Sequence, residues 1–190
     1  ILIKAKRTDA MTSLKQRLAA LPLALSLAAI ATPTFAAEVA VGNPIEKDGM
    51  NIAAVYLQSV KMAPELPGMD KPTDIHLEAD IHAVRGNEQG FRDEAWIPYL
   101  TITYTIEKLG SDWKTAGLFL PMCANDGPHY GDNVKLDGPG KYKVTFNIEP
   151  PAYNGFYHHV DKETGTKEWW EPFQVAWDFA YVGTGKKGGY

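Results

Sequence analysis

Hydrophobic and polar residues alternate along residues 75–84, which predicts a β-strand with one apolar face. Isoleucine, leucine and alanine occupy the odd positions of this stretch and would face the interior of a sheet. Four side chains that can bind metal ions share the opposite face, namely His76, Glu78, Asp80 and His82. This row of potential ligands is the strongest functional signal in the alternation.

Other stretches alternate in the same way or form short apolar runs rich in Val, Ile, Thr and aromatic residues, which favour strands. The predicted strands are 52–57, 75–84, 96–107, 116–122, 141–148 and 174–182. Segments rich in Pro, Gly, Asn and Asp, such as 125–132, are predicted to connect them. Because the chain beyond residue 36 lacks a long helical period, the pattern predicts an all-β protein, an immunoglobulin-like antiparallel β-sandwich.

The N-terminal part of the chain has the pattern of a secretory signal peptide. From Met11 a short basic region leads into the apolar stretch 18–30 and then into small residues that end at Ala36. We therefore expect residues 1–36 to comprise upstream residues and a signal peptide cleaved near Ala36. Residues 37–190 would form a single metal-binding domain. The apolar stretch is too short for a comfortable membrane span, so no stable span is expected after cleavage.

The predicted cleavage changes the charge of the protein. It removes five of the 19 basic residues and one of the 23 acidic residues, which leaves a net charge of −8 with histidine neutral. This balance argues against nucleic-acid binding, which requires a clustered positive surface, and suits a protein that binds cations. Cys123 is the single cysteine, so an internal disulfide is impossible. By alternation Cys123 faces away from Met122, and we expect a buried, inert thiol.

The spacing of the candidate ligands limits which of them can share an ion. His76 and His82 are separated by roughly 20 Å along an extended strand, so they cannot bind the same ion. His76 and Glu78 can line one site or two adjacent sites. A second cluster contains Met122 and His129. Thioether and imidazole ligands suit copper, especially Cu(I), whereas carboxylates favour harder ions such as iron or manganese.

A third cluster lies in the long connection that precedes Trp169 and Trp170. Its adjacent histidines, His158 and His159, could each reach a metal site, and the alternation does not choose between them. The sequence contains no nucleophile motif, phosphate-binding loop or dinucleotide fingerprint, so it predicts no catalytic residue.

Several motifs, in this order, closely resemble those of the periplasmic iron-transport proteins that accompany bacterial high-affinity iron permeases. The family includes a treponemal membrane antigen. The motifs span nearly the whole chain after the predicted signal peptide and are Asn51–Gln58, Asp74–His82, Asp126–Tyr130, His159–Asp161 and Trp170–Phe173.

The resemblance implies a homodimeric immunoglobulin-like sandwich with a copper site whose ion assists in iron transport. Its copper ligands would be His76, Met122, His129 and His159, and Glu78 would line a neighbouring position for iron or a second copper ion. His158 occupies a position where the relatives have a different residue.

Together these observations predict a periplasmic protein that binds copper and ferrous iron and supports iron uptake through an inner-membrane iron permease. Two alternatives are a periplasmic copper chaperone and a small copper electron carrier. The electron carrier normally has a Cys ligand followed by His and Met, whereas here Met122 precedes Cys123. A further alternative is a host-facing antigen that binds another protein.

Overall fold

The structure is a computed structural model, and it describes residues 38–65 and 67–183. The predicted signal peptide and its cleavage near Ala36 lie outside these residues and stay predictions, as does the single domain beginning at residue 37.

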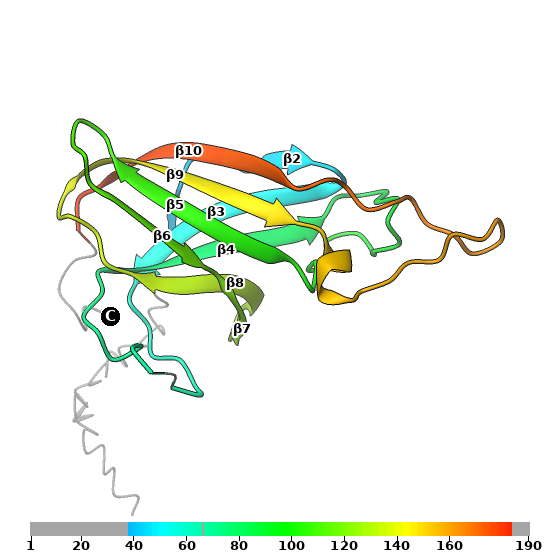
Figure 1. The fold of residues 1–190 in the computed structure, drawn as a ribbon, viewed down its shortest axis with the longest axis horizontal. Helices are drawn as coiled ribbons and strands as arrows, with labels where there is room; N and C mark the ends of the chain where they lie inside the picture. Colours follow the sequence, from blue (N-terminus) through cyan, green and yellow to red (C-terminus); the bar gives the residue numbers. More distant parts are fainter. Residues whose placement is uncertain (1–37, 66, 184–190) are drawn as a thin grey trace, which may run out of the picture. The chain divides into compact units, whose positions relative to one another are not determined.

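Two antiparallel sheets pack face to face in a sandwich (Figure 1). The first sheet has the order β1-β3-β4-β8-β7, with β2 paired to β3, and its strands are β1 (Val39–Ala40), β2 (Ile45–Lys47), β3 (Met50–Gln58), β4 (Ile75–Ala83), β7 (Leu120–Ala124) and β8 (Gly127–Val134). The second has the order β10-β9-β5-β6, and its strands are β5 (Thr101–Lys108), β6 (Lys114–Leu118), β9 (Gly140–Glu149) and β10 (Phe173–Tyr181). This arrangement confirms the predicted all-β, immunoglobulin-like antiparallel sandwich.

The predicted apolar faces form the core between the two sheets. On β4 the alternate residues Ile75, Leu77 and Ile81 are fully buried. On β5 and β9 the alternating apolar and aromatic residues are buried in the same way, including Tyr104 and Phe146. Alternation therefore directs one face of each strand into the core and leaves the outer face of β4 for its polar row.

Two predicted strands differ from the observed elements. The segment 116–122 is divided at Phe119, because β6 pairs with β5 in one sheet whereas β7 pairs with β8 in the other. Phe119 is buried and packs against Phe146 with ring centroids 5.0 Å apart. The predicted strand 96–107 begins only at Thr101, after Tyr99 adopts a φ of 63° that a strand does not allow.

The segment 125–132, predicted as a connection, is instead mostly strand. Only Asn125 and Asp126 form a turn, and β8 follows immediately and pairs with β7 on one side and β4 on the other. Glycine, proline, asparagine and aspartate have low strand propensity, but pairing on both sides overrides that preference here. This correction matters for function, because β8 carries His129.

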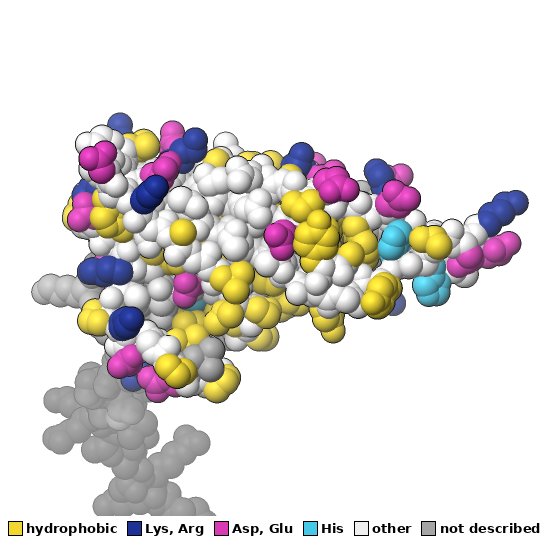
Figure 2. Space-filling view, in the orientation of Figure 1, with side chains coloured by type: hydrophobic (Ala, Val, Ile, Leu, Met, Phe, Trp, Pro, Cys, Tyr) yellow, Lys and Arg dark blue, Asp and Glu magenta, His cyan; other side chains and the backbone are white. Residues whose placement is uncertain are grey.

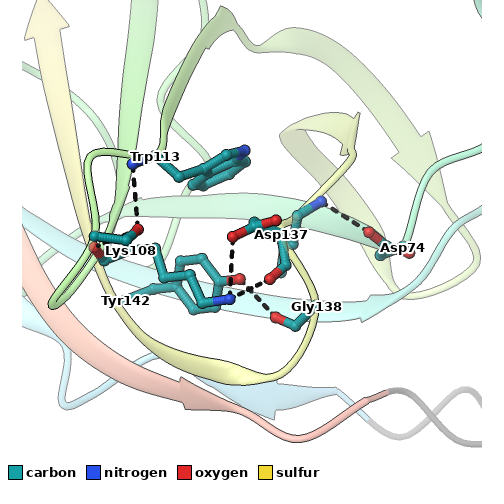
Figure 3. Close-up of polar contacts among 8 residues, drawn as sticks. Asp74, Lys108, Trp113, Asp137, Gly138 and Tyr142 are labelled. Atoms are coloured by element: carbon teal, nitrogen blue, oxygen red, sulfur yellow. Dashed lines mark hydrogen bonds and ion pairs between the residues drawn. The ribbon is translucent and has the colours of Figure 1, made fainter.

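Polar contacts anchor the chain where it leaves β8 for β9 (Figure 3). The ammonium group of Lys108 donates to the backbone carbonyl of Asp137 and lies 3.1 Å from its carboxylate. The Tyr142 hydroxyl donates to the Gly138 carbonyl at 2.6 Å. On the other side of the connection, Lys135 donates to the Asp74 carboxylate at 2.8 Å, next to the start of β4. These contacts tie the end of β8 to both sheets.

Candidate metal centre

The pairing of β4 with β8 brings potential metal ligands together on the outer face of the first sheet. His76 lies opposite Asn133 and Glu78 lies opposite Gly131, so His129 is the next residue on the same face of β8. An added Cβ at Gly131 would lie 2.6 Å from His76 Nε2. The absence of a side chain at Gly131 therefore leaves the space into which the neighbouring imidazoles project.

Two imidazoles and one carboxylate converge at this point. Nε2 of His76 and Nε2 of His129 each lie 3.5 Å from the same oxygen, Glu78 Oε1, and the three ligand atoms are all within 4.8 Å of one another. Ligands bonded to a tetrahedral metal at 2.0–2.1 Å are separated by about 3.4 Å. The spacing of these atoms therefore fits one small cation.

Burial makes this arrangement unusual for polar groups. His76 is 1% exposed, Glu78 is 6% exposed and His129 is 5% exposed. Both Nε2 atoms are buried and have no hydrogen-bond partner among the described residues. Leaving a buried polar atom unsatisfied costs about 1–3 kcal/mol, and a bound cation would satisfy both atoms at once.

The ionisation of the three groups suits cation binding. Burial lowers the pKa of His76 to about 4 and also lowers the pKa of His129, so both rings are neutral near pH 7 and keep a lone pair for a metal. Burial, followed by repulsion from Asp80, Glu38 and Asp126, raises the pKa of Glu78 to about 8. Without a cation this carboxyl group is therefore mostly protonated near pH 7, and a bound cation would displace its proton.

A cavity of about 250 Å³ adjoins Glu78 and is lined by further acidic groups, Glu38, Asp80 and Asp126, and by His82 and His129. The pKa of Glu38 and of Asp80 is raised, in both cases mainly by burial. Glu38 was not predicted as a site residue, because nothing in the local pattern places the residue before β1 at the cavity that Asp80 lines. The acidic cavity offers hard oxygen ligands next to the imidazole nitrogens.

The predicted ligand Met122 lies across from His129 in the pairing of β7 with β8. Directly paired residues of antiparallel strands project to the same face, so Met122 belongs to the face that carries the centre, and its side chain is half-buried. Cys123 was predicted to be a buried thiol, but it is exposed. Cys123 pairs with Pro128 next to the turn that joins β7 to β8, and Pro128 is exposed as well, so this end of the hairpin extends beyond the buried core.

His159 does not join the cluster within this chain. Its side chain is 74% exposed, and its Nδ1 lies 2.7 Å from Thr164 Oγ1 in the same connection. It borders a separate cavity, lined in part by Phe91 and Trp169. The neighbouring His158 packs edge-on against Trp169, with ring centroids 5.4 Å apart. Of the five predicted ligands, the chain thus brings His76, Glu78 and His129 together and separates His159 from them.

The fold and this centre define an all-β protein with a candidate metal site on the outer face of a sheet. The chain belongs to the family of Fe2+ transport proteins, whose model matches residues 35–183. This membership confirms the resemblance found in the sequence. Among the described residues, no helix has the length and apolar character needed to cross a membrane.

Related sequences and solved structures agree with this assignment. The chain is 51% identical over 180 residues to a UPF0423 protein of Brucella abortus, covering 92% of this chain and 97% of that one. It is 38% identical over 148 residues to the 34 kDa membrane antigen of Treponema pallidum, covering 74% and 72%.

A copper-bound variant of FetP from uropathogenic Escherichia coli has a TM-score of 0.73 and 51% identity, covering 77% of this chain and 99% of that one. Copper-reconstituted P19 from Campylobacter jejuni has a TM-score of 0.75 and 46% identity, covering 79% and 99%.

Proposed function

We propose that this protein is a periplasmic metal-binding protein that binds copper and ferrous iron and supports iron uptake through an inner-membrane iron permease. The observation that carries the proposal is the pair of buried, unpartnered Nε2 atoms of His76 and His129 beside Glu78 Oε1. Membership of the Fe2+ transport family and the copper-bound relatives support it. FetP was expressed in the periplasm, which supports the location.

The chemistry of the ligands suggests how the two metals would be divided. In the proposed copper site, His76 and His129 supply imidazole nitrogens and Met122 supplies a thioether, a set that suits copper. The carboxylates around the adjoining cavity, with Glu78 at its border, would bind the harder ferrous ion. We assign no catalytic residue, and any change of oxidation state would take place at the bound metal ions.

The fourth copper ligand of the proposal, His159, is best supplied by a second copy of the chain. The connection between η1 (Pro151–Asn154) and β10 extends beyond the strands in Figure 1, and Figure 2 shows histidine and hydrophobic side chains along it. Tyr157 is 87% exposed and Val160 is 81% exposed on either side of His158 and His159. Large apolar side chains at a projecting segment favour an interface, and a homodimer would cover them.

Metal titration tests the site. The purified protein would be titrated anaerobically with Cu(I), Cu(II) and Fe(II), in the wild type and in His76→Ala. We expect His76→Ala to weaken copper binding at least tenfold, with His82→Ala as the matched control on the same strand face. Undiminished copper binding in His76→Ala would show that the proposed site is wrong.

A complementation experiment tests the transport role. Cells that lack the protein are expected to take up less iron, and wild type should correct the deficit whereas Glu78→Gln should not. The copper chaperone alternative predicts normal iron uptake in the deleted strain. The electron-carrier alternative predicts an intense blue copper absorption that Cys123→Ala abolishes; the exposure of Cys123 and its position beside Met122 do not favour it.

A further inference from the structure

The His76 ring is held from the side opposite the metal centre. Its Nδ1 lies 3.0 Å from Oδ1 of Asn133, the residue directly across from it on β8. Because Nε2 points toward Glu78 and Nδ1 toward Asn133, the two ring nitrogens have different environments, and the partner of one nitrogen decides which of them carries the proton.

The orientation of the Asn133 amide is set by the backbone of Val60. The Val60 N–H donates to Asn133 Oδ1 at 3.2 Å, and Asn133 Nδ2 donates to the Val60 carbonyl at 2.7 Å. Rotating the amide by half a turn would place a donor against the Val60 N–H and an acceptor against its carbonyl. The oxygen of Asn133 is therefore the atom that faces His76.

This orientation determines the tautomer of His76. An amide oxygen only accepts hydrogen bonds, so the proton of the neutral ring must lie on Nδ1. The lone pair is then on Nε2, the buried atom that lacks a partner and faces the centre. In the other tautomer an N–H would point into the metal site, and two lone pairs would face each other at Asn133.

We propose that Asn133 is the positioning residue of the metal centre. It holds His76 in the Nδ1–H tautomer and ties the ring to the backbone of Val60, in the connection between β3 and β4. The consequence for metal binding rests on the proposed function, whereas the tautomer is a property of the metal-free protein. Loss of such a partner typically weakens metal binding about 10–100-fold.

The test measures the tautomer and the metal affinity separately. Long-range 1H–15N NMR of the metal-free protein should show the proton of His76 on Nδ1 in the wild type and in Asn133→Asp, which keeps an accepting oxygen for His76 but loses the donor to the Val60 carbonyl. Asn133→Leu should lose this preference. Copper competition titrations should show about 10–100-fold weaker binding in Asn133→Leu and a change of only a few-fold in Asn133→Asp.

Ser59→Ala is the matched control. It removes the hydrogen bond that Thr73 donates to Ser59 at 2.7 Å, which also ties the ends of the β3–β4 connection, but it leaves Val60 and Asn133 unchanged. Both readouts should stay at wild-type values in Ser59→Ala, and an equal loss of affinity there would overturn the assigned role. A wild-type His76 with its proton on Nε2 would overturn it even if Asn133→Leu fails to fold. A wild-type protein with the expected tautomer but no copper binding would instead refute the proposed function alone.

Discussion

At the scale of single residues, the metal centre depends on groups that are kept without partners. Two imidazole nitrogens and a carboxylate oxygen meet in a buried site. Burial lowers the pKa of both histidines and raises the pKa of Glu78, so each group favours its neutral form. The free energy that such an arrangement costs in the metal-free protein is recovered when a cation binds.

The stability of the metal-free protein should depend on pH through the ionisation of Glu78. The pKa of Glu78 in the folded protein is about 8, above the ordinary value of 4.5, so the folded state retains a proton that the unfolded chain has lost. Both histidines have a pKa below the ordinary 6.5, so above that pH they are neutral in the folded and the unfolded protein and add no further pH dependence to the stability. Stability of the metal-free protein should therefore fall by on the order of 1 kcal/mol as pH rises from about 6.5 to 8.

Urea unfolding across this pH range checks the expectation. Glu78→Gln cannot ionise, so its stability should change less with pH than that of the wild type. An equally steep decline in both proteins would assign the dependence to other groups.

The second residue-scale prediction concerns Gly131. A Cβ at this position would lie 2.6 Å from His76 Nε2 and 3.4 Å from the His129 ring. Gly131→Ala should therefore displace the His76 ring and weaken copper binding at least tenfold. The metal-free thermal midpoint should change by only a few degrees, because the methyl group meets the far end of the His76 side chain and no backbone atom. Unchanged copper affinity would mean that the position of the His76 ring does not matter for copper binding.

At the scale of elements, alternation along β4 was sufficient to predict which of its residues share a face, and this gave His76 and Glu78. It could not predict which strand lies beside β4. The sequence of β8, Gly-Pro-His-Tyr-Gly-Asp-Asn-Val, has the composition of a connection, so the strand that supplies His129 was missed. Pairing between distant segments decides both the neighbour of β4 and the strand character of β8. From the sequence, only the family resemblance indicated that His76, Met122 and His129 belong to one site.

The element-scale prediction concerns the crossing between sheets. Phe119 lies between β6 and β7 and packs against Tyr104 and Phe146, with ring centroids 4.8 Å and 5.0 Å away. Phe119→Ala should lower the free energy of unfolding by about 3–5 kcal/mol, as measured by urea denaturation. The adjacent Leu118 is 49% exposed, so Leu118→Ala should cost much less. Similar losses of unfolding free energy in the two variants would contradict the conclusion that Phe119 holds the crossing between the sheets.

At the scale of the whole molecule, the proposed homodimer would complete the metal site with a residue of the second chain. His76 and His129 belong to the sandwich, whereas His159 belongs to the projecting connection and contacts Thr164. If two copies exchange these connections, each site combines residues from both chains.

Mixing two inactive variants tests this arrangement. His76→Ala and His159→Ala should each bind copper weakly when pure. After unfolding and refolding together, mixed dimers should regain one intact site, formed by His76 of one chain and His159 of the other. Copper titration and analytical ultracentrifugation would measure the recovered sites and the dimer. No recovery in a mixture shown to contain mixed dimers would place His159 outside the site.

The position of Met122 on the edge strand has a consequence for a metal that changes its charge. His76 and His129 lie on β4 and β8, which are paired on both sides, whereas β7 is paired on one side only among the residues that the structure describes. Copper prefers different coordination geometries in its two oxidation states. In the proposed site the softer ligand is also the one whose strand can shift with the fewest broken hydrogen bonds. In that site the thioether would follow the ion between these geometries while the imidazoles stay in place, so a change in the oxidation state of the ion would require only a small rearrangement of the protein.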